Sequence, residues 1–229
     1  MIAMNYRIFP LADAALTVEF GNKISVELNN RVIQLARFFQ GNPFPGFVET
    51  IPAYASLSVF YDVSIVRKNF PEFPTAYDAV KSLTENAWQN TDELAETESR
   101  LIEIPVCFDA EYALDLVSVA VENNLTEREF VEIFLSKTYR VYMLGFMPGF
   151  AYLGEVDERI AVPRKDSPRL KVPKGSVVIA GRQTGIYSLE SPGGWQIIGK
   201  TNVKLFTPEA DAPTFLQAGD SVKFYRADF

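Results

Sequence analysis

The chain has 229 residues, of which 48% are apolar, so it is long enough for one large domain or two small ones. Its 22 basic and 29 acidic residues give a net charge of -7, which argues against a general nucleic-acid-binding protein. It contains no histidine and a single cysteine, Cys107. These counts exclude a Ser-His-Asp or Cys-His pair, a histidine-ligated metal site and an internal disulfide. Acid–base chemistry must therefore use Asp, Glu, Lys, Tyr, an external metal or a partner protein.

The sequence contains no recognisable targeting or membrane segment. Residues 1–20 lack the basic region and the continuous apolar region of a signal peptide. The longest apolar stretch, residues 141–154, is too short to cross a bilayer and is interrupted by glycines and Pro148. We expect a cytoplasmic protein that contacts neither membranes nor nucleic acid.

The first half of the chain is expected to alternate strands and helices. Ser25 is a suitable N-cap for a first helix, which Gly41 and Pro43 end, and Thr75 can cap a second helix. The order strand, helix, strand, strand, helix is typical of a small ferredoxin-like α/β sandwich. Period-two hydrophobicity predicts the three strands at residues 15–20, 48–54 and 57–61.

A polar, acid-rich stretch over residues 85–100 separates the two halves. Its beginning can finish the second helix, and its remainder has the composition of a linker. We therefore place an N-terminal α+β domain over residues 1–92 and a C-terminal domain over residues 93–229.

The second half is expected to start with a strand at residues 101–108 and a helix at residues 115–124. Thr126 and Glu129 have the spacing of a capping box for another helix, which runs to about Leu135. The pattern then changes to short β-type runs separated by Gly, Pro and Ser, which indicates a β-barrel or a compact β-rich domain. These runs are residues 139–143, 177–180, 186–189, 195–198 and 221–225.

Basic residues gather in one segment of this acidic chain. Residues 159–182 contain seven Lys and Arg and one acid, Asp166, so the segment carries +6 and the rest of the chain -13. Arginines on restrained backbone suit fixed contacts to an anion. A solvated loop face that balances acids elsewhere is the alternative interpretation. Two of the arginines directly follow a proline, in Pro163-Arg164 and Pro168-Arg169.

Two turns combine glycine, proline and large aromatic residues, at residues 145–149 and 191–195. Glycine permits close approach of a ligand, and proline lowers the entropy lost when a loop is ordered. Trp195 can stack on a ring while Gln196 hydrogen-bonds its edge. A purely structural role in tight barrel corners is equally consistent with the same residues. The candidate substrate-binding residues of these turns are Phe146, Pro148, Gly193, Gly194, Trp195 and Gln196.

A third polar cluster extends from Gly181 to Tyr187. Gln183 and Thr184 offer neutral hydrogen-bonding groups and Tyr187 offers a phenol, so we include all three among the candidate site residues. A turn that hydrogen-bonds to its own backbone is the alternative.

Motifs for nucleotides, metals and acid–base catalysis are weak. Lys174-Gly175-Ser176 has the residue types of a phosphate-binding loop in the wrong order, and no dinucleotide-binding glycine pattern is present. The carboxylates Asp109, Glu111 and Asp115 are close in sequence and one of them can act in acid–base chemistry, although Asp115 is more simply a helix N-cap. No metal-ligand set is evident.

Taken together, these motifs resemble one family, known as allophanate hydrolase subunit 1 or KipI/PxpB. The resemblance covers essentially the whole chain and is most specific from Val141 to Gly199. It implies a small N-terminal α+β domain and a C-terminal cyclophilin-like β-barrel with helices inserted early. The segments that carry it include residues 13–21, 51–54, 57–62, 141–154, 163–169, 172–176, 183–187 and 191–199.

Members similar to this chain act as the PxpB subunit of a bacterial 5-oxoprolinase, which opens the lactam of 5-oxoproline to glutamate using ATP, together with two partners, PxpA and PxpC. Activation of a lactam carbonyl by phosphorylation creates anionic intermediates. The resemblance therefore makes Arg164, Arg169 and Lys174 candidates for charge stabilisation, with Tyr187 as a further catalytic candidate. ATP is the implied cosubstrate, bound by this chain or shared with the partners.

Two other functions occur among relatives of this family. One is inhibition of a histidine kinase, as in KipI, and the other is a carboxyltransferase-like half of a urea carboxylase-type system. No residue of this sequence separates these functions from the first. Family members also often carry a histidine at the position of Phe134, which here lies on an apolar helix and is expected in the core.

Overall fold

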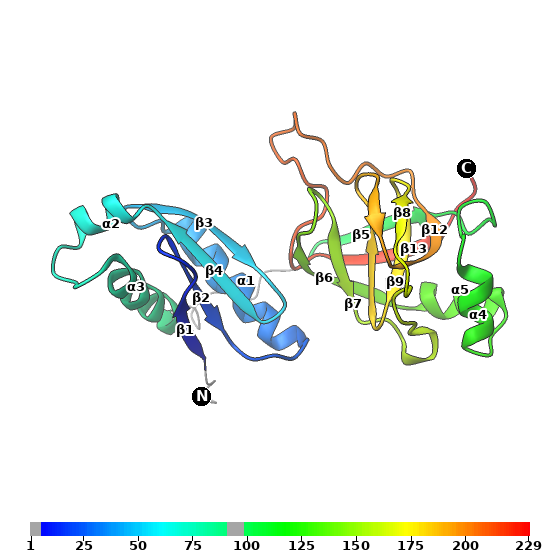
Figure 1. The fold of residues 1–229 in the computed structure, drawn as a ribbon, viewed down its shortest axis with the longest axis horizontal. Helices are drawn as coiled ribbons and strands as arrows, with labels where there is room; N and C mark the ends of the chain where they lie inside the picture. The colour runs from blue at the N-terminus through cyan, green and yellow to red at the C-terminus, as the bar shows by residue number, and fades with distance from the viewer. Residues whose placement is uncertain (1–5, 91–98) are drawn as a thin grey trace. The chain divides into compact units, whose positions relative to one another are not determined.

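The computed structural model describes residues 6–90 and 99–229. The chain divides into two compact units, Met1–Glu98 and Ser99–Phe229 (Figure 1). The predicted boundary between residues 92 and 93 lies outside the described residues. Within the described ranges, no helix combines the length and the apolar character needed to cross a membrane.

The first unit is built on a four-stranded antiparallel sheet in the order β1-β2-β4-β3. Helix α1 packs against β3 and β4, whereas α3 packs against β2. The strands are β1 (Arg7–Pro10), β2 (Ala15–Glu19), β3 (Phe47–Pro52) and β4 (Ser56–Tyr61), and the helices are α1 (Val26–Gly41), α2 (Val63–Asn69) and α3 (Ala76–Asn90).

Local signals set the helices of this unit. Ser25 caps α1 as predicted, since its hydroxyl accepts a hydrogen bond from the backbone N–H of Leu28. Thr75 accepts in the same way from the N–H of Asp78 at the start of α3. One face of α1 is buried against the sheet, and Leu35 and Leu57 are fully buried there.

The sequence patterns predict neither β1 nor α2 of the first unit. β1 is an edge strand with three exposed residues out of four, so its sequence does not alternate. α2 has seven residues, too few for a helical period to be visible, although Asp62 caps it. The predicted mixture of α and β structure is nevertheless confirmed for this unit.

The second unit contains a curled seven-stranded sheet in the order β12-β9-β10-β7-β6-β13-β5. Neighbouring strands are antiparallel except β13 and β5. The two edges meet where Cys107 and Lys200 exchange backbone hydrogen bonds of 2.8 and 2.9 Å. The strands are β5 (Leu101–Val106), β6 (Thr138–Leu144), β7 (Ala151–Gly154), β9 (Ser176–Ala180), β10 (Gln183–Ile186), β12 (Gln196–Lys200) and β13 (Ser221–Arg226).

Two helices and a short ribbon complete the second unit. α4 (Leu116–Glu122) packs on β12 and on α5 (Glu127–Ser136), while α5 packs on β13. The predicted capping box of α5 is confirmed. The ribbon pairs β8 (Arg169–Val172) with β11 (Ser191–Gly193).

The core prediction for Phe134 is confirmed. Its side chain is fully buried on α5, and its ring centroid lies 5.1 Å from those of both Tyr139 and Phe224. The hydroxyl of Tyr139 donates to the carbonyl of Phe134 at 2.7 Å. Phe134 is therefore part of an aromatic core in this chain.

The strand predicted at residues 186–189 is wrong in its position. The strand is β10, Gln183–Ile186, and it begins inside the stretch interpreted as a polar turn. After Tyr187 the chain leaves the sheet, and the hydroxyl of Ser188 donates to the carbonyl of Pro148 at 2.6 Å. The short strand β11 lies in the segment interpreted as a turn at residues 191–195, and the sequence patterns predict neither β7 nor β8 as a strand.

Candidate functional site

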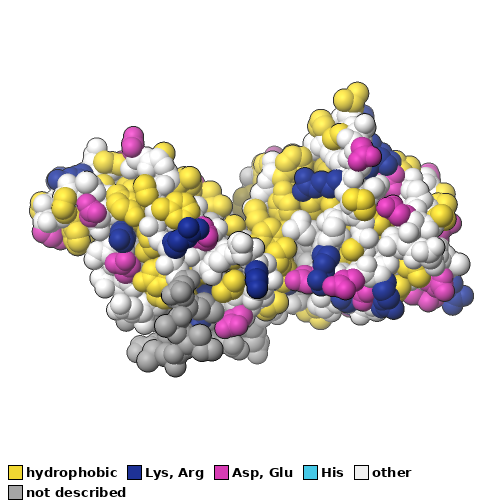
Figure 2. Space-filling view, turned by 60° about the horizontal axis from the view of Figure 1, so that its bottom comes forward, with side chains coloured by type: hydrophobic (Ala, Val, Ile, Leu, Met, Phe, Trp, Pro, Cys, Tyr) yellow, Lys and Arg dark blue, Asp and Glu magenta, His cyan; other side chains and the backbone are white. Residues whose placement is uncertain are grey.

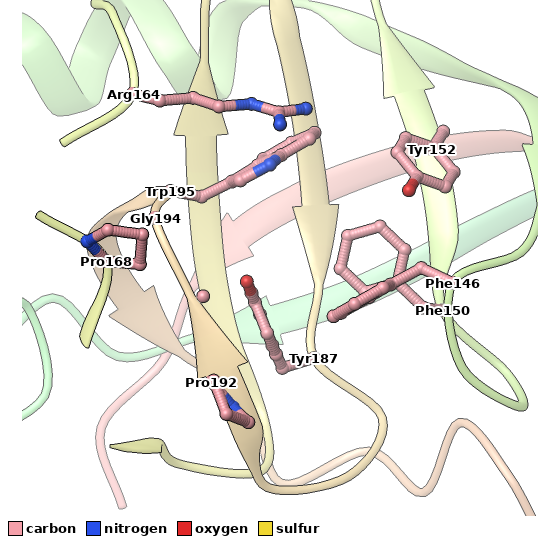
Figure 3. A pocket seen from close by; sticks show the side chains of 10 residues that line it. Phe146, Phe150, Tyr152, Arg164, Pro168, Tyr187, Pro192, Gly194 and Trp195 are labelled. Atoms are coloured by element: carbon pink, nitrogen blue, oxygen red, sulfur yellow. The ribbon is translucent and has the colours of Figure 1, made fainter. Parts of the chain in front are cut away.

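A pocket of about 250 Å³ opens in the second unit (Figure 3). Residues from five separate segments meet there: the β6–β7 loop, β7, the segment before β8, the segment after β10, and β11 with the residues that follow it. It is lined by Phe146, Phe150, Tyr152, Arg164, Pro168, Tyr187, Pro192, Gly193, Gly194 and Trp195.

The wall of the pocket is aromatic and rigid. The buried ring of Phe150 lies at its centre, with ring centroids 4.8 Å from Tyr152, 5.3 Å from Tyr187 and 5.8 Å from Trp195. All three contacts are edge-to-face, the arrangement that the ring quadrupoles favour. Because the rings fix one another, the pocket is preformed and offers flat apolar surfaces to a ligand.

Phe146 forms part of the rim. Its ring is 63% exposed and touches Phe150 and Tyr187 edge-on. Its backbone has φ of 71°, an unusual conformation for a residue other than glycine. Such strain is concentrated at functional sites, and here it holds a large apolar side chain at the pocket mouth.

The two adjacent glycines of the pocket differ in what their missing side chains would meet. A Cβ at Gly193 would lie 1.9 Å from the hydroxyl oxygen of Tyr187, so only glycine leaves room for the Tyr187 ring in this position. A Cβ at Gly194 would lie no closer than 3.6 Å to any atom, which is ordinary contact. Gly193 is thus needed for the position of Tyr187.

Arg164 supplies the cationic group of the pocket. Its guanidinium carbon lies 5.5 Å from the ring centroid of Trp195, and Figure 3 shows the guanidinium extended over that ring. Within residues 6–90 and 99–229, no carboxylate or other hydrogen-bond acceptor is paired with it. Its donors are available to an anion.

Arg169 has a different role, because it binds the carboxylate of Asp115. Two hydrogen bonds of 2.8 and 2.6 Å join the guanidinium to the two carboxylate oxygens. Lys165 adds a contact of 3.1 Å, and the backbone N–H of Ile197 donates to the same carboxylate at 2.7 Å. We call these four residues the Asp115 cluster.

The Asp115 carboxylate is only 4% exposed. Burial alone would raise its pKa, but the hydrogen bonds from Arg169, Ile197 and Lys165 outweigh that effect and lower the pKa below the ordinary value. Asp115 does stand at the N-cap position of α4, but its side chain makes no capping hydrogen bond. The predicted capping role is therefore wrong for the side chain, which instead ties the start of α4 to β8, to β12 and to Lys165 before β8.

Two hydrogen bonds separate from the Asp115 carboxylate fix the segment that carries Arg164. The backbone N–H of Lys165 donates to the carbonyl of Gly194 at 2.7 Å, and the amide of Gln196 donates to the carbonyl of Pro163 at 3.2 Å. The residues on both sides of Arg164 are thereby held, so its side chain starts from a fixed backbone.

Most of the predicted basic segment is paired with acids of the same chain. Besides the Asp115 cluster, Arg159 pairs with Asp157 at 3.0 Å, Lys171 pairs with Glu190 at 3.0 Å, and Arg182 contacts two glutamates. Figure 2 shows basic side chains next to acidic ones on the face of this unit in view. Five of the seven cations are thus neutralised, which leaves Arg164 and the exposed Lys174 without such a partner among the described residues.

The phenol of Tyr187 is one of two phenols in the pocket lining, together with that of Tyr152. Its hydroxyl points toward Trp195 in Figure 3. Burial raises the pKa of this phenol above its ordinary value near 10, and the neighbouring charge of Arg164 only partly opposes the rise. The phenol is therefore protonated at neutral pH and can both donate and accept a hydrogen bond.

The pocket brings together half of the residues that the sequence proposed for the site. Those in its lining are Arg164, Tyr187, Phe146, Gly193, Gly194 and Trp195. Those outside it are Arg169, Lys174, Pro148, Gln183, Thr184 and Gln196. Thr184, for example, is fully buried and donates to the carbonyl of Val178 at 2.8 Å.

The predicted site lacks four residues of the lining, Phe150, Tyr152, Pro168 and Pro192, of which Tyr152 carries a polar group. Tyr152 also had a signal in the sequence. It lies on β7, a strand of four residues, and alternates with the buried Ala151 and Leu153. That alternation, following a turn that contains glycine and proline, is the signal from which it can be found.

Among the described residues, no three Asp, Glu or Cys side chains are placed to hold a metal ion. The pocket itself contains no carboxylate. Its described lining offers one guanidinium, two phenols and apolar rings, a set of groups that can bind a small anion.

Comparison with known proteins places the chain in one family. Residues 6–216 match the model described as carboxyltransferase domain, subdomain C and D. The chain is 46% identical over 226 residues to the 5-oxoprolinase B subunit of Bacillus subtilis (strain 168), covering 98% of this chain and 94% of that protein. It is 39% identical over 218 residues to the 5-oxoprolinase B subunit of Escherichia coli O157:H7, covering 95% and 94% respectively. The crystal structure of TTHA0988 is similar with a TM-score of 0.80 and 34% identity, over 94% of this chain and 40% of that one.

Proposed function

The chain belongs to the family of carboxyltransferase domains, subdomains C and D, and we propose that within this family it is the B subunit of an ATP-dependent 5-oxoprolinase. The observation that carries the proposal is the 46% identity to a protein named as the 5-oxoprolinase B subunit over nearly the full length of both chains. The match extends across both compact units, so it is not confined to a shared fold in one of them.

The chemistry of the reaction explains why such a chain needs partners. A lactam is a stable amide, and its hydrolysis requires activation of the carbonyl and stabilisation of the charge that develops. The described part of this chain offers a receptor pocket but no carboxylate within it, and the sequence has no phosphate-binding loop. We therefore assign the missing groups to two other subunits, similar to PxpA and PxpC, in a cytoplasmic hetero-oligomer.

The finer fold assignment is part of this proposal. We infer that the first unit is a rearranged ferredoxin-like sandwich in which β1 occupies the edge that the last strand takes in the usual order. The connection β2-α1-β3 with β4 inserted between the two strands supports this view. For the second unit, the curled sheet with edges joined at Cys107 and Lys200 supports a cyclophilin-like barrel.

Reconstitution tests the function directly. The chain is mixed with its two partner subunits, 5-oxoproline and ATP, and glutamate is measured while each of the three proteins is omitted in turn. We expect glutamate only when all three are present, with ATP hydrolysis dependent on 5-oxoproline. An unchanged rate without this chain would falsify the assignment, and assays of kinase inhibition or of carboxyl transfer would then decide between the other two functions.

A further inference from the structure

We propose that the pocket lined by Arg164, Tyr187 and Trp195 is the binding site for 5-oxoproline, and that ATP binds elsewhere in the assembly. This inference rests on the proposed function and adds to it the division of the two substrates between sites. Size, charge and surface chemistry of the pocket each support it.

The volume of the pocket favours 5-oxoproline over ATP. The pocket encloses about 250 Å³, below the roughly 300–1,000 Å³ typical of pockets for drug-sized ligands. A nucleoside triphosphate, with a base, a ribose and three phosphates, is at least drug-sized. A five-membered lactam with one carboxylate is far smaller and fits the space.

The cation in the pocket lining also favours 5-oxoproline over ATP. A triphosphate needs several cations or a metal ion, whereas a carboxylate is matched by one guanidinium, which binds it through two parallel hydrogen bonds. Of the residues that the structure describes, Arg164 is the one cation in the pocket lining. Its neighbours Lys165 and Arg169 are occupied by Asp115. Among the described residues, the pocket lining therefore presents one guanidinium whose donors are free, which matches a single carboxylate.

The remaining surface suits a flat amide ring. Tyr152 and Trp195 border the pocket with rings that are fixed by edge contacts to each other and to the buried Phe150. The phenol of Tyr187 can donate to a lactam carbonyl or accept from a lactam N–H. Its hydroxyl points into the space between these rings (Figure 3). A ligand held by Arg164 at its carboxylate thus finds a hydrogen-bonding partner for its ring amide.

Steady-state kinetics of the assembled three-subunit enzyme tests this assignment. The variants are Arg164→Ala, Arg164→Lys and, as a matched control, Arg159→Ala, which removes an arginine of the same basic segment that lies outside the pocket lining. We expect Arg164→Ala to raise the KM for 5-oxoproline at least about tenfold and to leave the KM for ATP within about twofold. Arg164→Lys should fall between wild type and Arg164→Ala, and Arg159→Ala should match wild type.

The outcomes separate this inference from the proposed function. A rise in the KM for ATP in Arg164→Ala, or an unchanged KM for 5-oxoproline, overturns the site assignment while the chain remains an essential subunit. If turnover does not depend on the chain, the proposed function fails, and the site assignment fails with it. Circular dichroism of each variant verifies that it folds, and Arg164→Lys, which keeps the positive charge, preserves a test if Arg164→Ala does not fold.

Discussion

Two neighbouring regions of the second unit use the same sequence pattern in different ways. Pro163-Arg164 and Pro168-Arg169 each place an arginine after a proline, yet Arg164 faces an aromatic pocket without a carboxylate partner and Arg169 is bound to Asp115. The difference lies in the partner, which stands at the start of α4 and is 54 positions away from Arg169 in the sequence. The role of each arginine depends on which side chains the fold places next to it, because an arginine bound to a carboxylate has few hydrogen-bond donors left for a ligand.

The pocket and the Asp115 cluster also use their cations for different purposes. The cluster holds two cations on one carboxylate, and the pocket uses Arg164, the one cation in its lining among the described residues. The cluster is therefore expected to determine stability, whereas the pocket determines ligand binding. The following predictions test this separation.

The largest effect is expected from Asp115→Ala. The change leaves Arg169 and Lys165 without their counter-charge and the buried N–H of Ile197 without its acceptor. We expect a loss of about 3 kcal/mol in the free energy of unfolding of the second unit. Trp195 fluorescence during urea unfolding reports on this unit, in a Trp88→Phe background that removes the tryptophan of the first unit. Arg164→Ala is the control, and a loss of stability as large as that of Asp115→Ala would contradict the separation.

A smaller effect, confined to the pocket, is expected from Gly193→Ala. The new methyl group collides with the Tyr187 hydroxyl and displaces that ring, so we expect the KM for 5-oxoproline to rise about tenfold. Gly194→Ala is the matched control, since its methyl group meets only ordinary contacts, and its KM should stay within about twofold of wild type. Equal effects of the two substitutions would show that Tyr187 does not have to be held in place by Gly193.

The smallest effect is a pH dependence of the Asp115 cluster. Because the pKa of Asp115 is lowered in the folded state, its ionised form stabilises the fold above the unfolded pKa near 4, and this contribution is lost as the pH falls through and below that value. We expect wild type to be more stable than Asp115→Asn at pH 7 by about 1 kcal/mol, and this advantage to shrink toward pH 3. Urea unfolding at several pH values measures the gap, and a gap that stays constant would exclude the carboxylate's ionisation as its cause.

Local signals in the sequence predicted much of the fold. Ser25, Thr75 and the Thr126–Glu129 pair cap the helices that they were expected to cap, because a cap needs only residues within one turn. The strands that were missed, such as β1 and β7, have four residues each, so the alternation in β7 covers only a few positions and β1 shows none. The apparent turn at residues 181–185 lies largely in β10, since buried central strands need not alternate.

The types of residue at the site could be predicted from the sequence, but the side chains with which they pair could not. Glycine, proline and aromatic residues marked the two loops that supply Phe146 and Trp195, and both line the pocket. The pairing of Asp115 with Arg169 joins distant segments, and no local pattern reveals it. For the same reason, Asp115 was interpreted as a helix cap and Arg169 as a ligand-binding residue.

The most direct test of the central claim removes the carboxylate from the ligand and the guanidinium from the protein, separately and together. Equilibrium binding of 5-oxoproline and of 2-pyrrolidinone, the same lactam without the carboxylate, is measured without ATP for the assembled wild-type and Arg164→Ala enzymes. We predict that wild type binds 5-oxoproline at least about tenfold more tightly than 2-pyrrolidinone and that Arg164→Ala binds the two alike. If Arg164→Ala keeps the full wild-type preference for 5-oxoproline, the carboxylate is bound elsewhere and the account is contradicted.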